Sequence, residues 1–109
     1  MHLHDATLTR RLGPTLSKAR GVVILIHGRG SSPDDLGGLA RLFAAPGVAC
    51  FLPEAAGTTW YPHRFLVPPA QNEPWLSSAL AVVDTLVAEI LAAGIPSEHI
   101  ALAGFSQGA

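Results

Sequence analysis

Three short apolar runs punctuate the chain, at residues 22–26, 48–52 and 100–105. None of them alternates between apolar and polar positions, and the first is mostly β-branched. Continuous runs of this length are typical of strands that are buried on both faces of a parallel sheet. The first run ends at His27, and the third passes into a glycine-rich segment that begins at Gly104. The pattern therefore predicts three interior strands.

Two helices are predicted between these strands. Ser32 as N-cap, Pro33 at the first helical position and two carboxylates in the first turn predict a helix over about residues 33–44. A second helix is predicted over about residues 74–93 and is ended by Gly94. The apolar residues that keep helical spacing along it are Leu76, Leu80, Val83, Val87 and Ile90.

The order of the predicted elements indicates the fold class. Strands that alternate with helices imply right-handed crossovers, and thus an α/β fold with a mostly parallel sheet flanked by helices. Residues 1–20 are weakly patterned and are predicted to form an N-terminal arm or an edge strand, while residues 21–109 form the α/β unit. Residues 55–72 are rich in Gly, Pro and aromatic residues and fit no regular element. Loops of that length in compact domains are usually functional.

Composition narrows the class of protein. The chain has 109 residues, of which 49% are hydrophobic and only 14% charged, which excludes an intrinsically disordered tail. So little charge on so small a chain suggests apolar faces that contact something outside it. The net charge is −1 and no run of like charges occurs, so neither nucleic acid nor an anionic lipid surface is an expected partner.

The remaining bulk features are mild. Cys50 is the only cysteine, which excludes an internal disulfide framework and a cysteine-based zinc site, and it is predicted to be a core residue. The five histidines are scattered, as surface histidines usually are. The N-terminus lacks the regions of a signal peptide, and no apolar run reaches the roughly 18 residues that span a bilayer. We therefore expect a cytoplasmic protein without a membrane span.

The sharpest chemical signal is Gly104-Phe105-Ser106-Gln107-Gly108, which fits the G-x-S-x-G nucleophile elbow. A serine hydroxyl is a weak nucleophile and must stand clear of the sheet to meet a base and a substrate. A tight strand-to-helix turn achieves this, and Gly104 and Gly108 avoid clashes with the neighbouring strand and helix. Because the motif follows a predicted buried strand, we interpret Ser106 as a nucleophile. The alternative is an ordinary turn serine.

A second signal is His27-Gly28-Arg29-Gly30, at the end of the first predicted strand. Acyl transfer needs backbone N–H groups aimed at the developing oxyanion, and Gly28 and Gly30 would let the backbone approach closely. One donor is normally the residue after the nucleophile, here Gln107. The other comes from a loop after an earlier strand, for which Arg29 is best placed. The alternative is a plain strand-to-helix turn.

The same loop permits a different reading. Gly28-Arg29-Gly30 after a strand resembles the opening of the G-x-G-x-x-G dinucleotide motif, and Glu54 could mimic the acid that binds the ribose. The third glycine position holds Pro33, however, and His27 stands where an apolar residue is usual. A dinucleotide-binding domain therefore remains as an alternative.

Aromatic residues gather in the long loop. Trp60 is a candidate for the wall of a substrate pocket, with a role in capping the core as the equal alternative. His63 and His99 are expected to be structural or solvated and not catalytic.

Taken together, these motifs make the chain resemble the front half of an α/β-hydrolase, and more narrowly the phospholipase/carboxylesterase family that includes the acyl-protein thioesterases. The string Gly-Phe-Ser-Gln-Gly is characteristic of that family. The resemblance spans about residues 21–109. The segments that carry it are Leu25-Ile26-His27-Gly28-Arg29-Gly30, Phe51-Leu52-Pro53, Thr59-Trp60-Tyr61 and Ala103-Gly104-Phe105-Ser106-Gln107-Gly108-Ala109.

The resemblance implies a serine hydrolase that acts on carboxylic esters or thioesters. Ser106 would be the nucleophile, the Arg29 and Gln107 amides the oxyanion hole, and neither a metal nor an organic cofactor is implied. The triad of such enzymes runs Ser, then Asp or Glu, then His along the chain. Here only three residues follow Ser106, and every histidine precedes it.

We therefore expect the 109 residues to be inactive alone and to represent the N-terminal half of the domain. The expected partners are an acyl ester substrate and the remaining half of the hydrolase domain, in the same protein or in another chain. A truncated form would look the same. The least favoured alternative is a catalytically inactive half-domain that serves as an interaction module.

Overall fold

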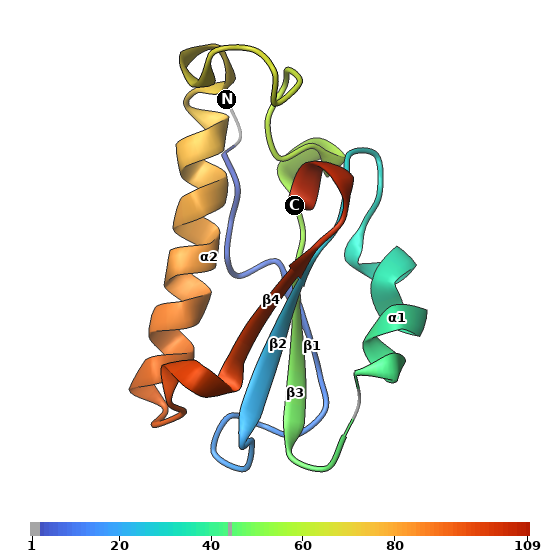
Figure 1. Cartoon of the computed structure of the whole chain (residues 1–109), viewed down its shortest axis with the longest axis vertical. Helices are drawn as coiled ribbons and strands as arrows, with labels where there is room; N and C mark the ends of the chain where they lie inside the picture. The colour runs from blue at the N-terminus through green and yellow to red at the C-terminus, as the bar shows by residue number, and fades with distance from the viewer. Residues whose placement is uncertain (1–2, 44) are drawn as a thin grey trace.

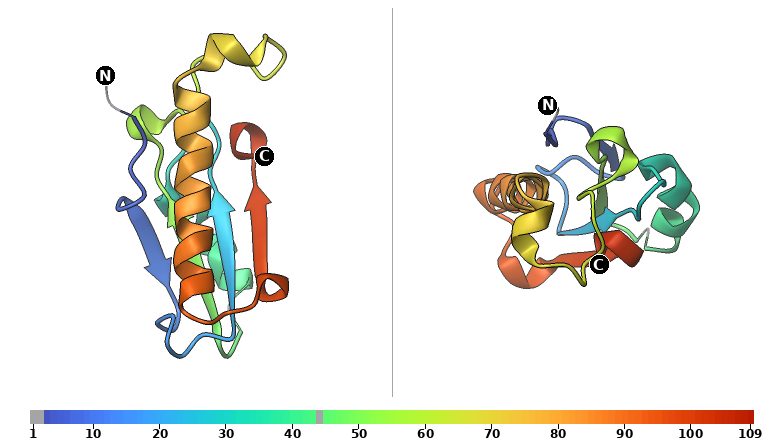
Figure 2. Two further views of the ribbon diagram at one scale, coloured as in Figure 1. Left: turned by 90° about the vertical axis from the view of Figure 1, so that its left-hand side faces the viewer. Right: turned by 90° about the horizontal axis from the view of Figure 1, so that it is seen from above.

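The computed structural model describes residues 3–43 and 45–109. Its centre is a four-stranded sheet, with α1 (Gly37–Leu42) on one side and α2 (Trp75–Ala92) on the other (Figure 1). The end-on view in Figure 2 shows the same three layers. The strands are β1 (Thr9–Leu12), β2 (Gly21–Ile26), β3 (Val48–Pro53) and β4 (Ile100–Gly104). The predicted α/β fold with helices flanking the sheet is confirmed.

The sheet has the order β1-β3-β2-β4. β2 pairs in parallel with β3 and with β4, for example Ile24 with Phe51 and with Leu102, while β1 runs antiparallel to β3. The sheet is therefore mostly parallel, as predicted. Because the carboxyl ends of β2, β3 and β4 lie at one end of the sheet, the loops that follow them gather there, at the top of Figure 1.

The first predicted helix is shorter than expected. Residues 33–36 form a 3₁₀ turn, and α-helix begins only at Gly37. Asp35 still supports the start, because its carboxylate accepts a hydrogen bond from the Ser32 N–H at 3.2 Å. Gly37 and Gly38 have low helix propensity, which explains why the segment does not form one regular helix. The end expected at Ala44 lies outside the described residues.

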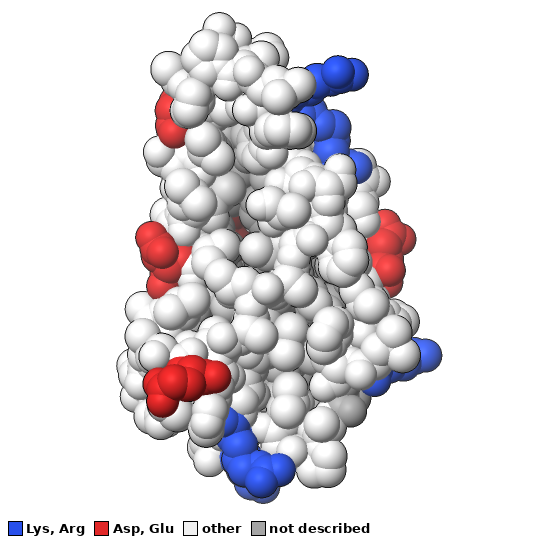
Figure 3. Space-filling model, viewed as in Figure 1, with Lys and Arg blue, Asp and Glu red and all other residues white. Residues whose placement is uncertain are grey.

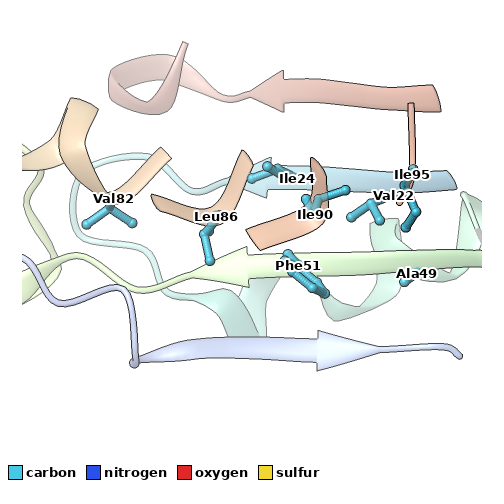
Figure 4. Close-up of a cluster of buried hydrophobic side chains, with 8 residues drawn as sticks. All are labelled: Val22, Ile24, Ala49, Phe51, Val82, Leu86, Ile90 and Ile95. Carbon is cyan, nitrogen blue, oxygen red and sulfur yellow. The ribbon is translucent and has the colours of Figure 1, made fainter. Parts of the chain in front are cut away.

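The core consists of two clusters of buried side chains, one on each face of the sheet. The cluster beneath α2 contains Val22, Ile24, Ala49, Phe51, Val82, Leu86, Ile90 and Ile95 (Figure 4). The cluster beneath α1 contains Leu25, Leu36, Ala40, Cys50 and Leu52. Adjacent residues of β2 and β3 contribute to opposite clusters, since successive side chains of a strand point to opposite faces. Both strands are thus buried on two sides, as their unbroken apolar runs predicted.

The face of α2 that packs on the sheet matches the predicted stripe only in part. Ile90 is buried and Val87 packs against the core cluster, as predicted, but Val82 and Leu86, which lie outside the stripe, are also buried. The amino-terminal part of the stripe instead borders an apolar groove of about 200 Å³ between α2 and the end of β4, where Leu76, Leu80 and Val83 form one wall and Leu80 is 58% exposed. Apolar residues occur on almost every side of α2, so the spacing of apolar residues alone could not identify the face that packs on the sheet.

β4 lies at an edge of the sheet. It is predicted to be an interior strand of a larger domain, and among the described residues it pairs only with β2 (Figure 2). Leu102 is 57% exposed as a result. Within the described ranges, α2 is long and apolar enough to cross a membrane by those two criteria, a test that the core helices of soluble proteins also pass.

Candidate active site

Ser106 lies directly after β4 and has the backbone geometry of a nucleophile elbow. Its φ angle is +53°, a left-handed conformation that L-residues other than glycine rarely adopt. A Cβ atom at Gly104 would collide with the carbonyl oxygen of Gly108, and one at Gly108 would lie 2.6 Å from the carbonyl oxygen of His27. The turn can close only because both flanking residues are glycines.

The loop after β2 packs against this turn. A Cβ atom at Gly28 would lie 3.3 Å from the Ser106 Cβ and 3.1 Å from the Phe105 carbonyl oxygen, so the two backbones are in close contact. Gly30 has a φ of +74°, and its N–H donates a hydrogen bond to the Thr58 carbonyl at 2.8 Å. The two glycines of this loop therefore have different roles. Gly28 allows the close approach of the two backbones, and Gly30 adopts the left-handed conformation of the turn.

The predicted nucleophile and both predicted oxyanion donors border one cavity of about 400 Å³. Its lining residues are Arg29, Tyr61, Arg64, Phe65, Leu66, Ser106 and Gln107. Within the described part of the chain, the backbone N–H groups of Arg29 and Gln107 have no hydrogen-bond acceptor. The structure thus brings Ser106, Arg29 and Gln107 together, while their chemical roles stay predictions.

The side chain of Gln107 has a structural role that the sequence did not reveal. Its Oε1 accepts a hydrogen bond from the Trp60 N–H at 2.8 Å, and its Nε2 donates one to the Tyr61 carbonyl at 2.6 Å. The Tyr61 hydroxyl donates a longer bond of 3.4 Å to the Gln107 carbonyl. Gln107 therefore ties the elbow to the long loop on the opposite side of the cavity.

Trp60 is mainly a core residue. It is only 3% exposed, and its indole N–H donates to the His27 carbonyl at 2.8 Å. Its ring also borders the apolar groove beside α2, but it does not line the Ser106 cavity. Of the two predicted roles, the structure favours capping the core beneath the loop.

His27 corrects the expectation that the scattered histidines lie on the surface. Its side chain is fully buried. Nε2 accepts a hydrogen bond from the Ala55 N–H at 3.0 Å, so Nδ1 is the donor in the 2.7 Å bond to the Gly28 carbonyl. His27 therefore joins the loop after β3 to the predicted oxyanion loop and is unavailable as a base. Its position directly after the unbroken apolar run at residues 22–26 could have indicated burial.

His4, in the N-terminal arm, has a similar function. Its Nδ1 accepts from the Ala56 N–H at 3.0 Å, and its Nε2 lies 2.6 Å from the Trp60 carbonyl oxygen, to which it donates. Its backbone N–H donates to the Ser78 hydroxyl at 3.0 Å. The arm thus holds both the long loop and the start of α2, a link that no local sequence pattern signals.

Other polar side chains fix the rest of the long loop. The guanidinium of Arg29 donates to the Pro62 and His63 carbonyls at 3.0 and 3.2 Å. Asn72, which is buried, accepts from the His63 N–H at 2.7 Å. The His63 side chain is exposed and does not line the cavity, as is also true of His99. None of the described residues that line the cavity is a histidine, aspartate or glutamate.

Other chemistries find little support. No group of three or more His, Cys, Asp or Glu among the described residues could hold a metal ion. Cys50 is buried, and burial raises the pKa of its thiol, which suppresses the reactive thiolate. Glu54, the candidate ribose-binding acid, instead pairs with Arg10 at 3.9 Å, and Pro33, which is buried, begins a 3₁₀ turn. These positions argue against a dinucleotide site.

Comparison with protein families decides the relationship. The family model described as Phospholipase/Carboxylesterase matches residues 13–109. The chain belongs to this family. The matched residues include both candidate motifs, the predicted oxyanion loop and the predicted nucleophile elbow.

A solved structure agrees with the family assignment. The crystal structure of a phospholipase/carboxylesterase from Dyadobacter fermentans is 41% identical in sequence and superposes with a TM-score of 0.90. The match covers 99% of this chain but 51% of that protein, so the chain spans about half the length of its relative. No curated protein matches the chain. The predicted resemblance to half of an α/β-hydrolase domain is confirmed.

Proposed function

We propose that this family member supplies the nucleophile and the oxyanion hole of a serine hydrolase that cleaves carboxylic esters or thioesters. The observation that carries the proposal is the backbone of Ser106. A non-glycine residue held at a φ of +53° between two glycines indicates that the strain serves to present its hydroxyl. The unpaired amides of Arg29 and Gln107 border the same cavity and support the assignment.

The proposed reaction proceeds through an acyl-serine. The Ser106 Oγ attacks the carbonyl carbon while a histidine of the complete protein takes its proton, and the carbonyl oxygen becomes an oxyanion. The amides of Arg29 and Gln107 donate to that oxygen. The tetrahedral intermediate collapses, the histidine protonates the departing alcohol or thiol, and water then releases the acid by the same steps. An acidic residue of the complete protein orients the histidine.

We assign the acid and the base of the triad to residues outside these 109, either in the same protein or in another chain. His27 is engaged on both ring nitrogens, and none of the histidines that the structure describes borders the cavity. Loss of triad members costs on the order of a millionfold in turnover in a comparable enzyme, so the 109 residues alone are expected to be inactive.

Covalent labelling tests the proposal. The full-length protein is treated with a fluorophosphonate probe and its intact mass is measured. We expect a single adduct that maps to Ser106 and disappears in Ser106→Ala, whereas the control Ser97→Ala, an exposed serine beside β4, is still labelled. A folded full-length protein that takes up no probe would rule out the proposed function.

One observation favours a second candidate. Among the described residues β4 pairs on one side only, and Leu102 on it is exposed, so this edge is suited to receive another chain. An inactive half-domain that serves as an interaction module would use this edge. It predicts neither labelling nor hydrolysis at full length, together with a partner protein that protects the β4 edge from hydrogen exchange.

A further inference from the structure

The cavity beside Ser106 carries positive charge that ester hydrolysis does not require. Arg29 and Arg64 both line it, and the seven lining residues include no Asp or Glu. Figure 3 shows Lys and Arg atoms gathered at the upper right of the molecule, at the end where the loops of the site lie. The charge is therefore concentrated beside the candidate nucleophile.

The two arginines differ in how they are held. The Arg29 guanidinium donates to two neutral carbonyl oxygens, of Pro62 and His63, so it is fixed in place but not neutralised. Arg64 is held through its backbone, because the buried Asn72 donates to its carbonyl at 3.4 Å. Within the described residues, the Arg64 side chain makes no hydrogen bond or ion pair. Arg64 thus presents an unpaired cation at the cavity from an anchored backbone.

An apolar surface adjoins this charge. Phe65 and Leu66 line the same cavity and are 78% and 76% exposed. A ligand that fits such a site has an apolar chain and an anionic group. A purely apolar ester would leave Arg64 without a partner, and a purely polar ester would leave Phe65 and Leu66 in water.

We propose that this cavity selects esters that carry an anionic group, a carboxylate or a phosphate, and that Arg64 binds that group. The inference rests on the proposed function only in that it places the ester carbonyl of the ligand at Ser106. Arg64 is exposed, so the contact is screened by water and salt. An exposed ion pair raises affinity by at most about fivefold, and we expect an effect of that size at low ionic strength.

Three ligands of one skeleton test the proposal: hexyl acetate, 6-acetoxyhexanoate and 6-acetoxyhexyl phosphate. They share the acetyl ester and the alkyl chain and differ in the terminal group. Their binding to the full-length Ser106→Ala variant, which leaves the esters intact, is measured by calorimetry at low and high salt. The carboxylate and phosphate ligands together tell which anion is preferred.

We expect both anionic esters to bind about fivefold more tightly than hexyl acetate at low salt, with the preference shrinking as salt is added. Adding Arg64→Gln should abolish the preference, while Arg41→Gln, at an exposed arginine of α1, should retain it. Equal affinities, no measurable binding of the anionic esters, or a preference that survives Arg64→Gln would each overturn the proposal.

Turnover of the same esters by the unmutated full-length protein separates this inference from the proposed function. Anion-selective binding without hydrolysis of any ester would contradict the hydrolase and leave the selectivity standing. Hydrolysis of all three esters without selective binding would contradict the proposed selectivity and leave the hydrolase standing.

Discussion

β2 and β4 are neighbouring parallel strands, and each carries one half of the candidate site at its carboxyl end. β2 lies between two partners, and its Ile24 and Leu25 are fully buried. β4 has one partner among the described residues, and Leu102 at its middle is largely exposed. The candidate nucleophile therefore follows the less supported strand. Its position depends on the turn itself and on the loop after β2.

The contacts that hold the turn are mostly between backbones. Gly104 meets Gly108, Gly108 meets His27, and Gly28 meets Phe105 and Ser106. Close packing of this kind fixes a loop without the area of apolar surface that anchors a central strand. The contrast between the two strands leads to four predictions, ordered from the largest expected effect to the smallest.

Truncating a leucine should cost far more on β2 than on β4. Leu25→Ala should lower the free energy of unfolding of the 109-residue chain by about 2–5 kcal/mol, since it leaves a cavity in the core. Leu102→Ala should change it by less than about 1 kcal/mol, because much of that side chain is in water already. Urea unfolding measures both. Comparable losses would mean that the exposed side of β4 is covered in solution.

A methyl group at the elbow should also be destabilising. Gly108→Ala places a Cβ against the carbonyls of Ile26 and His27, and overpacking of this kind costs about 1–3 kcal/mol. Gly37→Ala is the matched control, because that helical position has open space, and it should be neutral or slightly stabilising. Thermal unfolding of the two variants gives the comparison. An elbow that tolerates the methyl group would show that the turn is not close-packed.

Gln107→Glu tests the bridge between the elbow and the long loop. A carboxylate can still accept from the Trp60 N–H but cannot donate to the Tyr61 carbonyl, which would lose its partner. We expect a loss of about 1 kcal/mol and faster amide exchange at Trp60. The exposed Gln71→Glu, with the same change of charge, should leave both unchanged. Unaltered exchange at Trp60 in Gln107→Glu would exclude the bridge.

The smallest expected effect on stability concerns β1, at the edge of the sheet opposite β4. Arg11 of β1 pairs with Glu89 of α2 at 2.5 Å, and this hydrogen bond lowers the pKa of Glu89 from its ordinary value of 4.5. A lowered folded-state pKa contributes stability above pH 4.5, which is lost as the pH falls through the folded value. Both groups are exposed, so we expect less than about 1 kcal/mol.

Glu89→Gln measures that contribution. Its difference in stability from the unmutated chain should be present at pH 7 and vanish near pH 3. The exposed Glu98→Gln is a useful reference, because within the described residues Glu98 hydrogen-bonds only to its own turn and not to another element. A difference that grows in acid would contradict the assignment.

Much of the fold could be predicted from local patterns in the sequence. The runs at residues 22–26 and 48–52 predicted two strands buried on both faces. Helical spacing together with Gly94 predicted the limits of α2 to within one residue. The pattern did not predict that β4 is an edge here, because hydrophobicity reports that a strand is built for burial and not which strands adjoin it. It also predicted the packing face of α2 only in part, because the other sides of that helix are nearly as apolar.

The candidate site could likewise be predicted only in part from the sequence. The glycines and Ser106 could be found from spacing, because a strained turn imposes strict local requirements. The side-chain bonds of Gln107 and His4 join positions about fifty residues apart, and nothing local marks them. The burial of His27 depends on an acceptor role toward the Ala55 N–H that only the folded chain creates.

The bonds of His4 bear on how this protein is handled in the laboratory. The imidazole near the amino end supports the backbone of Ala56 and Trp60, beside the cavity of Ser106. An affinity tag or a truncation at that end therefore acts on the long loop that lines part of the cavity, even though the alteration is remote in sequence. Affinity tags are better fused elsewhere. A preparation whose molecules begin at different residues is expected to contain molecules that differ in how well this loop is held.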